Sequence, residues 1–358
     1  MAINHGANLF ELSKELGLKT SEILDFSSNI NPFGASKKAK EAVIKNIDMA
    51  SIYPDPKYIE LKKSISNYCD SKIKDIVLGA GATELISSFI NIIDPRRALL
   101  ICPAYSEYER ELKKNKCEII KYFAIKENEF KIDIEELKKK AIETKCNLIV
   151  ICNPNNPTGF AFNKGEIEKL LKGYNGFVMV DETYVEFTNT NLYSVSSLVN
   201  NYNNLFVIRG TSKFFSTPGI RLGYGLISNE SVRNKILEKL DLWNINIFAE
   251  VMGTVMFKDC EYIEDTIKHM ADERAYLNRE LKCINGIRVY DSKGNFILCE
   301  IEKNGLTVDE LYNSLIKEGI IIRNCSSFEG LNNNFFRVCV LKHNENELLI
   351  KKLKSIIK

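Results

Sequence analysis

The chain has 358 residues, of which 45% are hydrophobic and 27% charged, and its formal net charge is +2. This balance leaves no basic stripe for nucleic acid, no stretch approaches the roughly 18 apolar residues of a transmembrane helix, and no signal peptide is visible. Ten cysteines without a CxxC pair and three distant histidines argue against a disulfide scaffold or a metal centre. We therefore expect a cytoplasmic protein with one large and one smaller domain, no metal and no membrane partner.

The first part of the chain combines amphipathic helices with one polar loop. A short helix is predicted over residues 9–16, where Gly17 stops it. The segment 24–34, LDFSSNINPFG, is awkward as a helix or a core strand, so it either connects elements or lies across a pocket. Further helices are predicted at 36–46 and 58–69, with a turn at Tyr53 between them.

Residues 76–208 alternate between short apolar runs and charged amphipathic helices. Buried strands are predicted at 98–102, 148–152, 177–180 and 205–208, and the intervening helices include 134–143 and 164–171. Such alternation predicts a mostly parallel sheet covered by helices on both faces. Ligands of such sheets bind at the carboxyl ends of the strands.

The last third of the chain has a different pattern. A long helical region at about 231–281 is followed by strands at 294–301, 320–323 and 335–341, a helix near 308–317 and a last helix from 345. This pattern predicts a smaller α+β domain. We expect an N-terminal arm over the active site (1–35), a large domain (36–240) and a small domain (241–358).

Polar motifs follow several of the predicted strands. The turn from Gly79 to Glu84, GAGATE, would open a helix whose free amides bind phosphate, although glycine-rich turns are common. Tyr105 follows the next strand and could stack on a planar ring or simply pack in the core. The loop 153–159, NPNNPTG, would hold an amide rigidly between prolines. Asp181 ends a buried strand and needs a partner, unless it caps the next helix, a role that Glu182 could also fill.

The stretch from Arg209 to Tyr224, RGTSKFFSTPGIRLGY, is the centre of this pattern. Lys213 follows an apolar run, Ser212 precedes it, and the Pro218-Gly219 turn brings Arg221 back towards it. An amine with a hydroxyl and a guanidinium nearby suits a phosphorylated aldehyde, which lysine can bind as a Schiff base. The alternative is a surface lysine on an ordinary loop.

Two arginines stand in apolar strands of the predicted small domain. Arg323 ends the run 320–322, and Arg337 lies within Phe335-Phe336-Arg337-Val338. A buried arginine is costly unless it is paired, and a substrate carboxylate or a protein carboxylate would serve. The sequence leaves both possibilities open, with an internal ion pair more plausible for Arg323 than for Arg337.

In these motifs and their order, nearly the whole chain resembles the fold-type I pyridoxal-phosphate enzymes, the class I and II aminotransferase superfamily. The resemblance implies an α/β fold, with a mostly parallel large-domain sheet and a smaller α+β domain, and pyridoxal 5′-phosphate bound to Lys213. Asp181 would bind the pyridine nitrogen, so that the ring can act as an electron sink. Asn156 and Tyr184 would bind the phenolic oxygen. The implied cofactor contacts are Tyr53, Ala82, Thr83, Tyr105, Asn156, Asp181, Tyr184, Ser212, Lys213 and Arg221. Many relatives have a hydroxyl where this chain has Gly210, so Thr211 or Ser212 would have to compensate.

The resemblance also implies how substrate and subunits are arranged. Arg337 would bind the substrate α-carboxylate, and Arg323 would help to bind a distal phosphate. The implied substrate contacts are His5, Asn31, Asn156, Arg323 and Arg337. Tyr53 matches a tyrosine that reaches the cofactor phosphate of a neighbouring subunit, which implies a homodimer with shared sites.

Two groups within the superfamily compete. The segments HGAN (5–8) and LDFSSNINPFG (24–34) resemble the threonine-phosphate decarboxylases of cobalamin synthesis, and Ile30 stands where histidinol-phosphate aminotransferases usually have Glu. Ala82-Thr83-Glu84 and the segments at 322–325 and 328–331 favour the same group. We expect decarboxylation of L-threonine O-3-phosphate to aminopropanol phosphate, with transamination of histidinol phosphate and 2-oxoglutarate as the alternative. The choice between threonine phosphate and serine phosphate stays open. A non-enzymatic regulator is another alternative, but it would leave the complete set of catalytic residues without a role.

Overall fold

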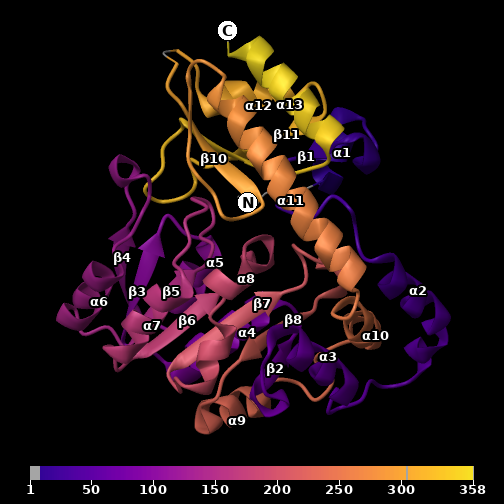
Figure 1. The fold of residues 1–358 in the computed structure, drawn as a ribbon, viewed down its shortest axis with the longest axis vertical. Helices are drawn as coiled ribbons and strands as arrows, with labels where there is room; N and C mark the ends of the chain where they lie inside the picture. Colours follow the sequence, from indigo (N-terminus) through magenta and orange to yellow (C-terminus); the bar gives the residue numbers. More distant parts are fainter. Residues whose placement is uncertain (1–8, 304, 358) are drawn as a thin grey trace.

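The computed structural model describes residues 9–303 and 305–357. A seven-stranded sheet with its helices forms the lower part of the molecule, and a four-stranded sheet with three helices forms the upper part (Figure 1). In the described ranges, no helix is both long and apolar enough to cross a membrane.

The large sheet is mostly parallel, as predicted. Its strands, in spatial order, are β2 (Ile76–Gly79), β8 (Gly223–Leu226), β7 (Leu205–Gly210), β6 (Phe177–Asp181), β5 (Leu148–Cys152), β3 (Arg97–Cys102) and β4 (Glu118–Phe123). Neighbours from β7 to β4 pair in parallel, and β8 runs antiparallel to both β7 and β2. The four strands β3, β5, β6 and β7 are almost entirely buried, which explains why their apolar runs were visible in the sequence.

The predicted strands do not include β2, β4 and β8, and for β4 and β8 the physical reason is clear. β4 is an edge strand with half-exposed residues, so its apolar pattern is diluted by Glu118 and Lys121. β8 has the sequence GYGL, and glycine weakens any strand signal.

The helices of the large part follow the predicted pattern. They are α2 (Lys37–Lys45), α3 (Ile59–Cys69), α4 (Ala82–Ile93), α5 (Ser106–Lys114), α6 (Ile134–Glu143), α7 (Lys164–Lys172), α8 (Thr190–Tyr193), α9 (Glu230–Lys239) and α10 (Ile247–Met256). The long helical region divides into α9, α10 and α11 (Cys260–Lys282), because Asn246 accepts a hydrogen bond from the Ala249 amide and so begins a new helix.

The upper part contains the antiparallel sheet and the remaining helices. Its strands, in spatial order, are β12 (Arg323–Asn324), β13 (Phe335–Cys339), β10 (Phe296–Ile301) and β9 (Ile287–Val289). Together with α11, the helices α12 (Val308–Ile316) and α13 (His343–Ile356) pack around it. The strand expected at 320–323 is two strands, since β11 (Ile320–Ile321) leaves the sheet to pair elsewhere.

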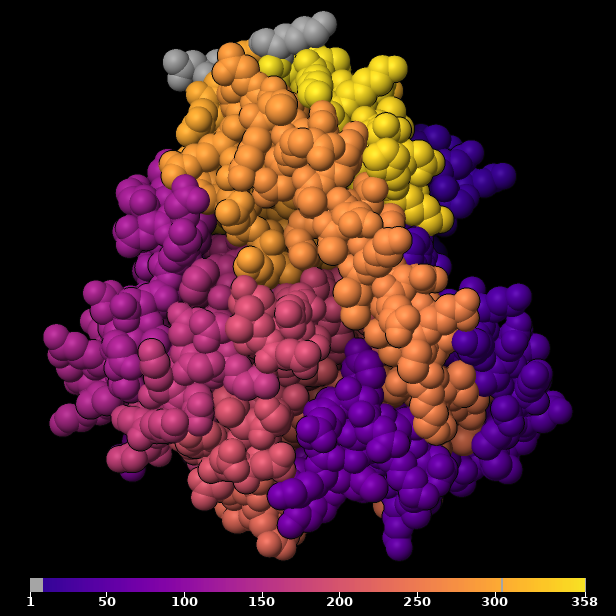
Figure 2. All heavy atoms as spheres, viewed as in Figure 1, coloured from indigo at the N-terminus to yellow at the C-terminus, as the bar shows by residue number. Residues whose placement is uncertain are grey.

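The N-terminal segment is divided between the two parts. Strand β1 (Leu24–Asp25) pairs in parallel with β11, and the Phe26 amide donates to the Ile321 carbonyl at 2.8 Å. Figure 2 shows α1 (Leu9–Leu16), in indigo, near the yellow C-terminal helix, whereas α2 and α3 lie beside α10 below. Residues 26–31 therefore cross from the small part to the large one. The domain limits given above stay predictions.

Candidate active site

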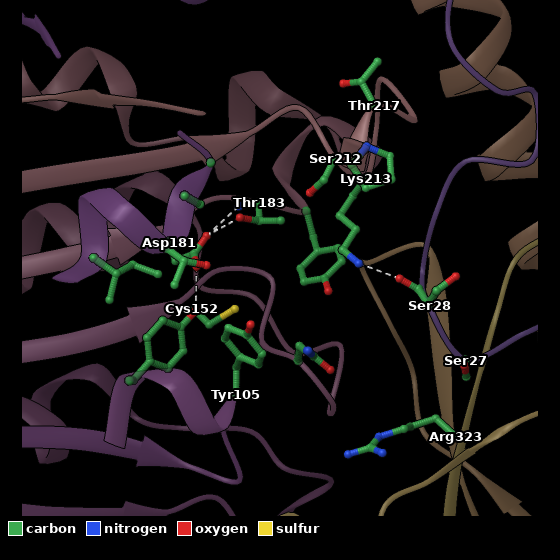
Figure 3. Close-up of a pocket in the computed structure, with 18 of the residues that line it drawn as sticks. Ser27, Ser28, Tyr105, Cys152, Asp181, Thr183, Ser212, Lys213, Thr217 and Arg323 are labelled. Atoms are coloured by element: carbon green, nitrogen blue, oxygen red, sulfur yellow. Dashed lines mark hydrogen bonds between the residues drawn. The ribbon is translucent and has the colours of Figure 1, made fainter. Parts of the chain in front are cut away.

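A cavity of about 290 Å³ opens where the carboxyl ends of the central strands face the small domain (Figure 3). Its walls bring together residues that lie far apart in the sequence. Those named above that line it are Ala82, Thr83, Tyr105, Asn156, Asp181, Tyr184, Ser212, Lys213, Arg221, Arg323 and Arg337.

The Lys213 amine points into this cavity between the large-domain wall and the N-terminal segment. Its Nζ donates a hydrogen bond to the Ser28 carbonyl at 2.6 Å. Burial, and then the nearby positive charge of Arg337, lower the pKa of Lys213 to about 8. More of this amine is neutral near pH 7 than for an exposed lysine, which suits a nucleophile.

Asp181 is held rigidly at the end of β6. Its Oδ1 accepts from the Thr183 amide at 2.9 Å and from the Thr183 hydroxyl at 2.6 Å, and its Oδ2 accepts from the Tyr108 hydroxyl at 2.6 Å. Burial raises the pKa of Asp181, and these hydrogen bonds partly oppose the rise. Neither Asp181 nor Glu182 caps the following short helix, Val185–Phe187, whose N-cap residue is Tyr184 and has no side-chain capping bond; the contacts with Thr183 fix a turn before it. The Asp181 carboxylate meets only neutral donors, so a cationic N–H in the cavity would be a favourable partner.

The N-terminus of α4 lies beside the Arg221 guanidinium. Gly81 has φ +88°, and a Cβ there would come within 2.4 Å of Arg221 Nη2, so only glycine lets the guanidinium approach the helix N-terminus. Arg221 itself adopts a left-handed backbone and donates to the Ala80 carbonyl at 3.2 Å. Free amides and a guanidinium at one point favour phosphate.

Of the two hydroxyls that could compensate for Gly210, one is engaged elsewhere. Thr211 is buried and donates to the Leu222 carbonyl at 3.0 Å, whereas Ser212 lines the cavity. Thr217, which the sequence did not single out, also lines it.

The small-domain wall carries two guanidinium groups. Arg337 is 4% exposed; it donates to the Asn156 amide oxygen and to the Ser27 carbonyl, and its buried Nε has no hydrogen-bond partner. In the described ranges it forms no ion pair with a carboxylate. Arg323 donates to the Ser327 hydroxyl at 3.0 Å and lies over the Phe328 ring. Burial and the charge of Arg337 lower the pKa of Arg323.

Two of the predicted residues lie outside the cavity, and the position of a third is not described. His5 falls outside the described residues. Asn31 is buried but does not line the cavity, since its amide donates to the Phe214 carbonyl, Tyr262 and Thr266. Tyr53 is 74% exposed and stacks on Trp243 with ring centroids 4.3 Å apart.

The structure adds residues that sequence reasoning missed. Ser27, Ser28, Tyr108 and Thr183 line the cavity. Asn29, two positions before Asn31, donates to the Tyr184 hydroxyl at 3.3 Å. The polar loop 24–34 was a visible signal for Ser27, Ser28 and Asn29. Tyr108, three residues after Tyr105, was signalled by its place one helical turn further along.

Comparison with known proteins agrees with this geometry. Residues 21–353 match the family described as aminotransferase class I and II. A protein of Caldanaerobacter subterraneus, provisionally named threonine-phosphate decarboxylase, is 38% identical over 98% of this chain and 93% of its own. A histidinol-phosphate aminotransferase of Methanosphaera stadtmanae is 32% identical over 98% and 95%. The crystal structure of a histidinol-phosphate aminotransferase from Clostridium acetobutylicum superimposes with a TM-score of 0.87 at 37% identity, over 93% of this chain and 99% of that one.

The residues present fit pyridoxal 5′-phosphate, the cofactor of this family. The cavity offers an amine with a lowered pKa, a buried carboxylate that has no cationic partner among the described residues, and a helix N-terminus beside a guanidinium. These are the groups needed by an aldehyde, a pyridine nitrogen and a phosphate. The chain belongs to the class I and II aminotransferases, with pyridoxal 5′-phosphate as its cofactor.

Proposed function

We propose that this chain decarboxylates L-threonine O-3-phosphate, or a close analogue, to aminopropanol phosphate. The observation that carries the proposal is the pair of guanidinium groups, Arg337 and Arg323, on one wall of the cavity that holds Lys213. In the described ranges Arg337 forms no ion pair with a protein carboxylate, so a substrate carboxylate would supply its counter-charge, and a substrate phosphate would bind to Arg323 on the same wall. Histidinol phosphate has one anionic group and would match this wall less well.

The N-terminal segment supports the same choice. Residues 24–34, whose sequence resembles the decarboxylases, lie against the reacting groups: Ser28 accepts from Lys213, Ser27 accepts from Arg337, and Asn29 donates to Tyr184. The segment that differs between the two groups of enzymes is thus in contact with the side chains proposed for the reaction.

Bound pyridoxal 5′-phosphate supplies an electron sink, so that a bond at the substrate α-carbon can break. Asp181 would stabilise positive charge at the pyridine nitrogen, and the α4 N-terminus with Arg221 would hold the phosphate. The Lys213 amine would attach the cofactor and move a proton at the α-carbon. Arg337 and Arg323 hold the substrate at two ends, and the torsion that they impose selects carboxylate loss or hydrogen loss.

The second candidate is histidinol-phosphate aminotransferase. It is favoured by the 37% identity and TM-score of 0.87 to the Clostridium acetobutylicum structure. In that reaction, 2-oxoglutarate would be the doubly anionic partner of the two arginines.

The two candidates are separated by offering both substrates in parallel. Threonine phosphate and serine phosphate are incubated with the protein, and carbon dioxide and the amino-alcohol phosphate are followed. Histidinol phosphate with 2-oxoglutarate is offered separately, and glutamate is followed, with Lys213→Ala as the inactive control. We expect carbon dioxide from threonine phosphate and little glutamate. Rapid glutamate formation without carbon dioxide would establish the aminotransferase instead.

We also propose that the protein is a cytoplasmic homodimer with shared sites. Several large apolar side chains that are more than half exposed stand near Tyr53 in the sequence or next to its stacking partner Trp243: Ile44, Ile47, Ile52 and Leu242. Apolar surface concentrated in this way favours a covered interface. In sedimentation at working concentration, the protein should be a dimer, and Tyr53→Ala should weaken cofactor binding, whereas Phe10→Ala, at another exposed aromatic, should not. A fully active monomer would contradict the shared site.

A further inference from the structure

The strand ends that carry Asp181 and Gly210 have charged residues on their opposite face. Successive side chains of a strand point to opposite sides of the sheet. Asp181 faces the cavity, and a Cβ on Gly210 would meet Ala82 at 3.5 Å, on the cavity side. Glu182 and Arg209, their direct neighbours in sequence, therefore lie behind the sheet.

Glu182 and Arg209 form a buried ion pair there. Glu182 is fully buried and Arg209 is 3% exposed. Arg209 Nε donates to Glu182 Oε2 at 2.9 Å, and Arg209 Nη2 lies 2.8 Å from the same oxygen. The Ser194 hydroxyl joins the two, because it accepts from Arg209 Nη2 at 2.6 Å and donates to Glu182 Oε2 at 3.0 Å.

The pair lies where the backbone ladder between β6 and β7 runs out. The last registered residues are Asp181 and Ile208, and the Glu182 amide still donates to the Ile208 carbonyl at 2.8 Å. Beyond this point, β7 pairs only with β8, through Gly210 and Gly223. The side-chain pair extends the connection between the strand end that holds Asp181 and the chain that continues to Lys213.

We propose that Glu182 and Arg209 are positioning residues, which hold Asp181 in register with Lys213 and so set how tightly both ends of the cofactor are bound. Neither residue lines the cofactor cavity in the described chain. Their effect would reach the cofactor through the strand ends alone, since each is covalently adjacent to a residue on the cavity side. A shift of the β6 end along β7 would separate the carboxylate from the amine.

A second carboxylate, that of Glu186, also lies beside Arg209 and affects which variants can test the pair. Glu186 Oε1 lies 3.7 Å from Arg209 Nη1, and burial raises the pKa of Glu186 to about 7. When Glu182 is lost, Glu186 remains as a counter-charge. Removing both Glu182 and Arg209 avoids a lone buried guanidinium, which is the usual cause of unfolding when one partner of such a pair is deleted.

The test compares Glu182→Gln/Arg209→Met with a control pair, Asp75→Asn/Arg233→Met. Asp75, which is buried, and Arg233, whose side chain is 11% exposed, also form an ion pair in the large domain, at 3.2 Å, and neither lines the cavity. For each holoenzyme, the dissociation constant of pyridoxal 5′-phosphate, the pH midpoint of its visible absorbance and the melting temperature are measured. These readouts do not depend on which substrate is turned over, so a failure of this proposal can be distinguished from a failure of the proposed reaction.

We expect the Glu182/Arg209 variant to bind the cofactor at least about tenfold more weakly, with the pH midpoint moved, while the control changes only in melting temperature. Equal cofactor affinity and an unmoved midpoint in the Glu182/Arg209 variant would overturn the proposal. If that variant does not fold, Arg209→Lys decides, since it keeps the charge and loses the planar fork. The proposal requires weaker cofactor binding in Arg209→Lys than in Arg233→Lys, and equal binding in the two would refute it.

Discussion

Arg209 behind the large sheet and Arg337 on the cavity wall are almost equally buried, at 3% and 4% exposed. Arg209 meets the carboxylates of Glu182 and Glu186, so its charge is compensated inside the protein. Arg337 meets an amide oxygen and a main-chain carbonyl, and its Nε has no partner. Because a buried guanidinium is costly without a counter-charge, the second arrangement makes sense for a site that receives an anion.

The same contrast holds for two successive carboxylates. Glu182 pairs with a guanidinium, whereas Asp181 accepts only from the neutral Thr183 and Tyr108. The charges of Glu182 and Arg209 satisfy one another, whereas Asp181 and Arg337 have no charged partner among the described residues and could each receive a ligand group. Loss of a charge behind the sheet should therefore lower stability as well as cofactor affinity, whereas changes in the cavity should affect function and leave stability nearly unchanged, as the four cases below test.

The largest effect is expected from Lys213→Ala. Loss of the amine removes both the covalent attachment of the cofactor and the proton carrier, so turnover should fall by at least about 10³-fold. The free energy of unfolding should change little, because a partly buried amine with a lowered pKa contributes little stability. The measurement is borohydride reduction followed by peptide mapping, which should place the label on Lys213 in the wild type. A label on another lysine would show that the cavity has been misread.

Arg209→Met and Arg337→Met test the comparison directly. Arg209→Met leaves two buried carboxylates without a cation and should lower the free energy of unfolding by about 3–5 kcal/mol. Arg337→Met removes an uncompensated guanidinium, so unfolding should be unchanged or harder, while KM for an anionic substrate should rise about 10- to 150-fold. Denaturant titration and steady-state kinetics measure both. Equal loss of stability in the two variants would remove the distinction.

Asp181→Asn should have an intermediate effect. The amide keeps the shape of the side chain but loses a charge-assisted hydrogen bond to the cofactor, which is worth about 1.5–3 kcal/mol. Turnover should fall correspondingly, with the fold intact by circular dichroism. Near-normal turnover would mean that the carboxylate serves only the turn at Thr183. The Thr183→Ala variant is a control for that structural contribution.

The smallest effect concerns pH. Since the pKa of Lys213 is lowered to about 8, uptake of pyridoxal 5′-phosphate by the cofactor-free protein should accelerate as pH rises through about 8, where the amine loses its proton. Removing the neighbouring positive charge in Arg337→Met should raise this pKa and move the midpoint to higher pH, whereas Arg337→Lys should leave it in place. Absorbance at several pH values measures the rate. A midpoint that stays fixed in both variants would show that Arg337 does not act on the amine.

Much of the fold was visible in the sequence because its signals are local. The helix predicted at 9–16 and the strand at 148–152 occur with those limits, since amphipathic period and continuous burial are both read within a few residues. The prediction of one strand at 320–323 was wrong, because the structure has two. Whether Arg323 continues β11 or begins another strand depends on where the distant partners β1 and β13 lie.

By itself, the sequence determined the buried strands and the polar residues that follow them, Lys213 and Asp181 among them, because chain order alone places these at one edge of a parallel sheet. Only the tertiary structure decided which charges are paired. Arg337 reaches Ser27 across 310 positions of sequence and Arg209 reaches Glu182 across 27. Periodicity cannot distinguish these arginines, since each lies in an apolar strand. Long-range packing places carboxylates beside Arg209 and, in the described chain, an amide oxygen and a main-chain carbonyl beside Arg337. This difference separates a charge that is paired inside the protein from one that we propose binds a ligand.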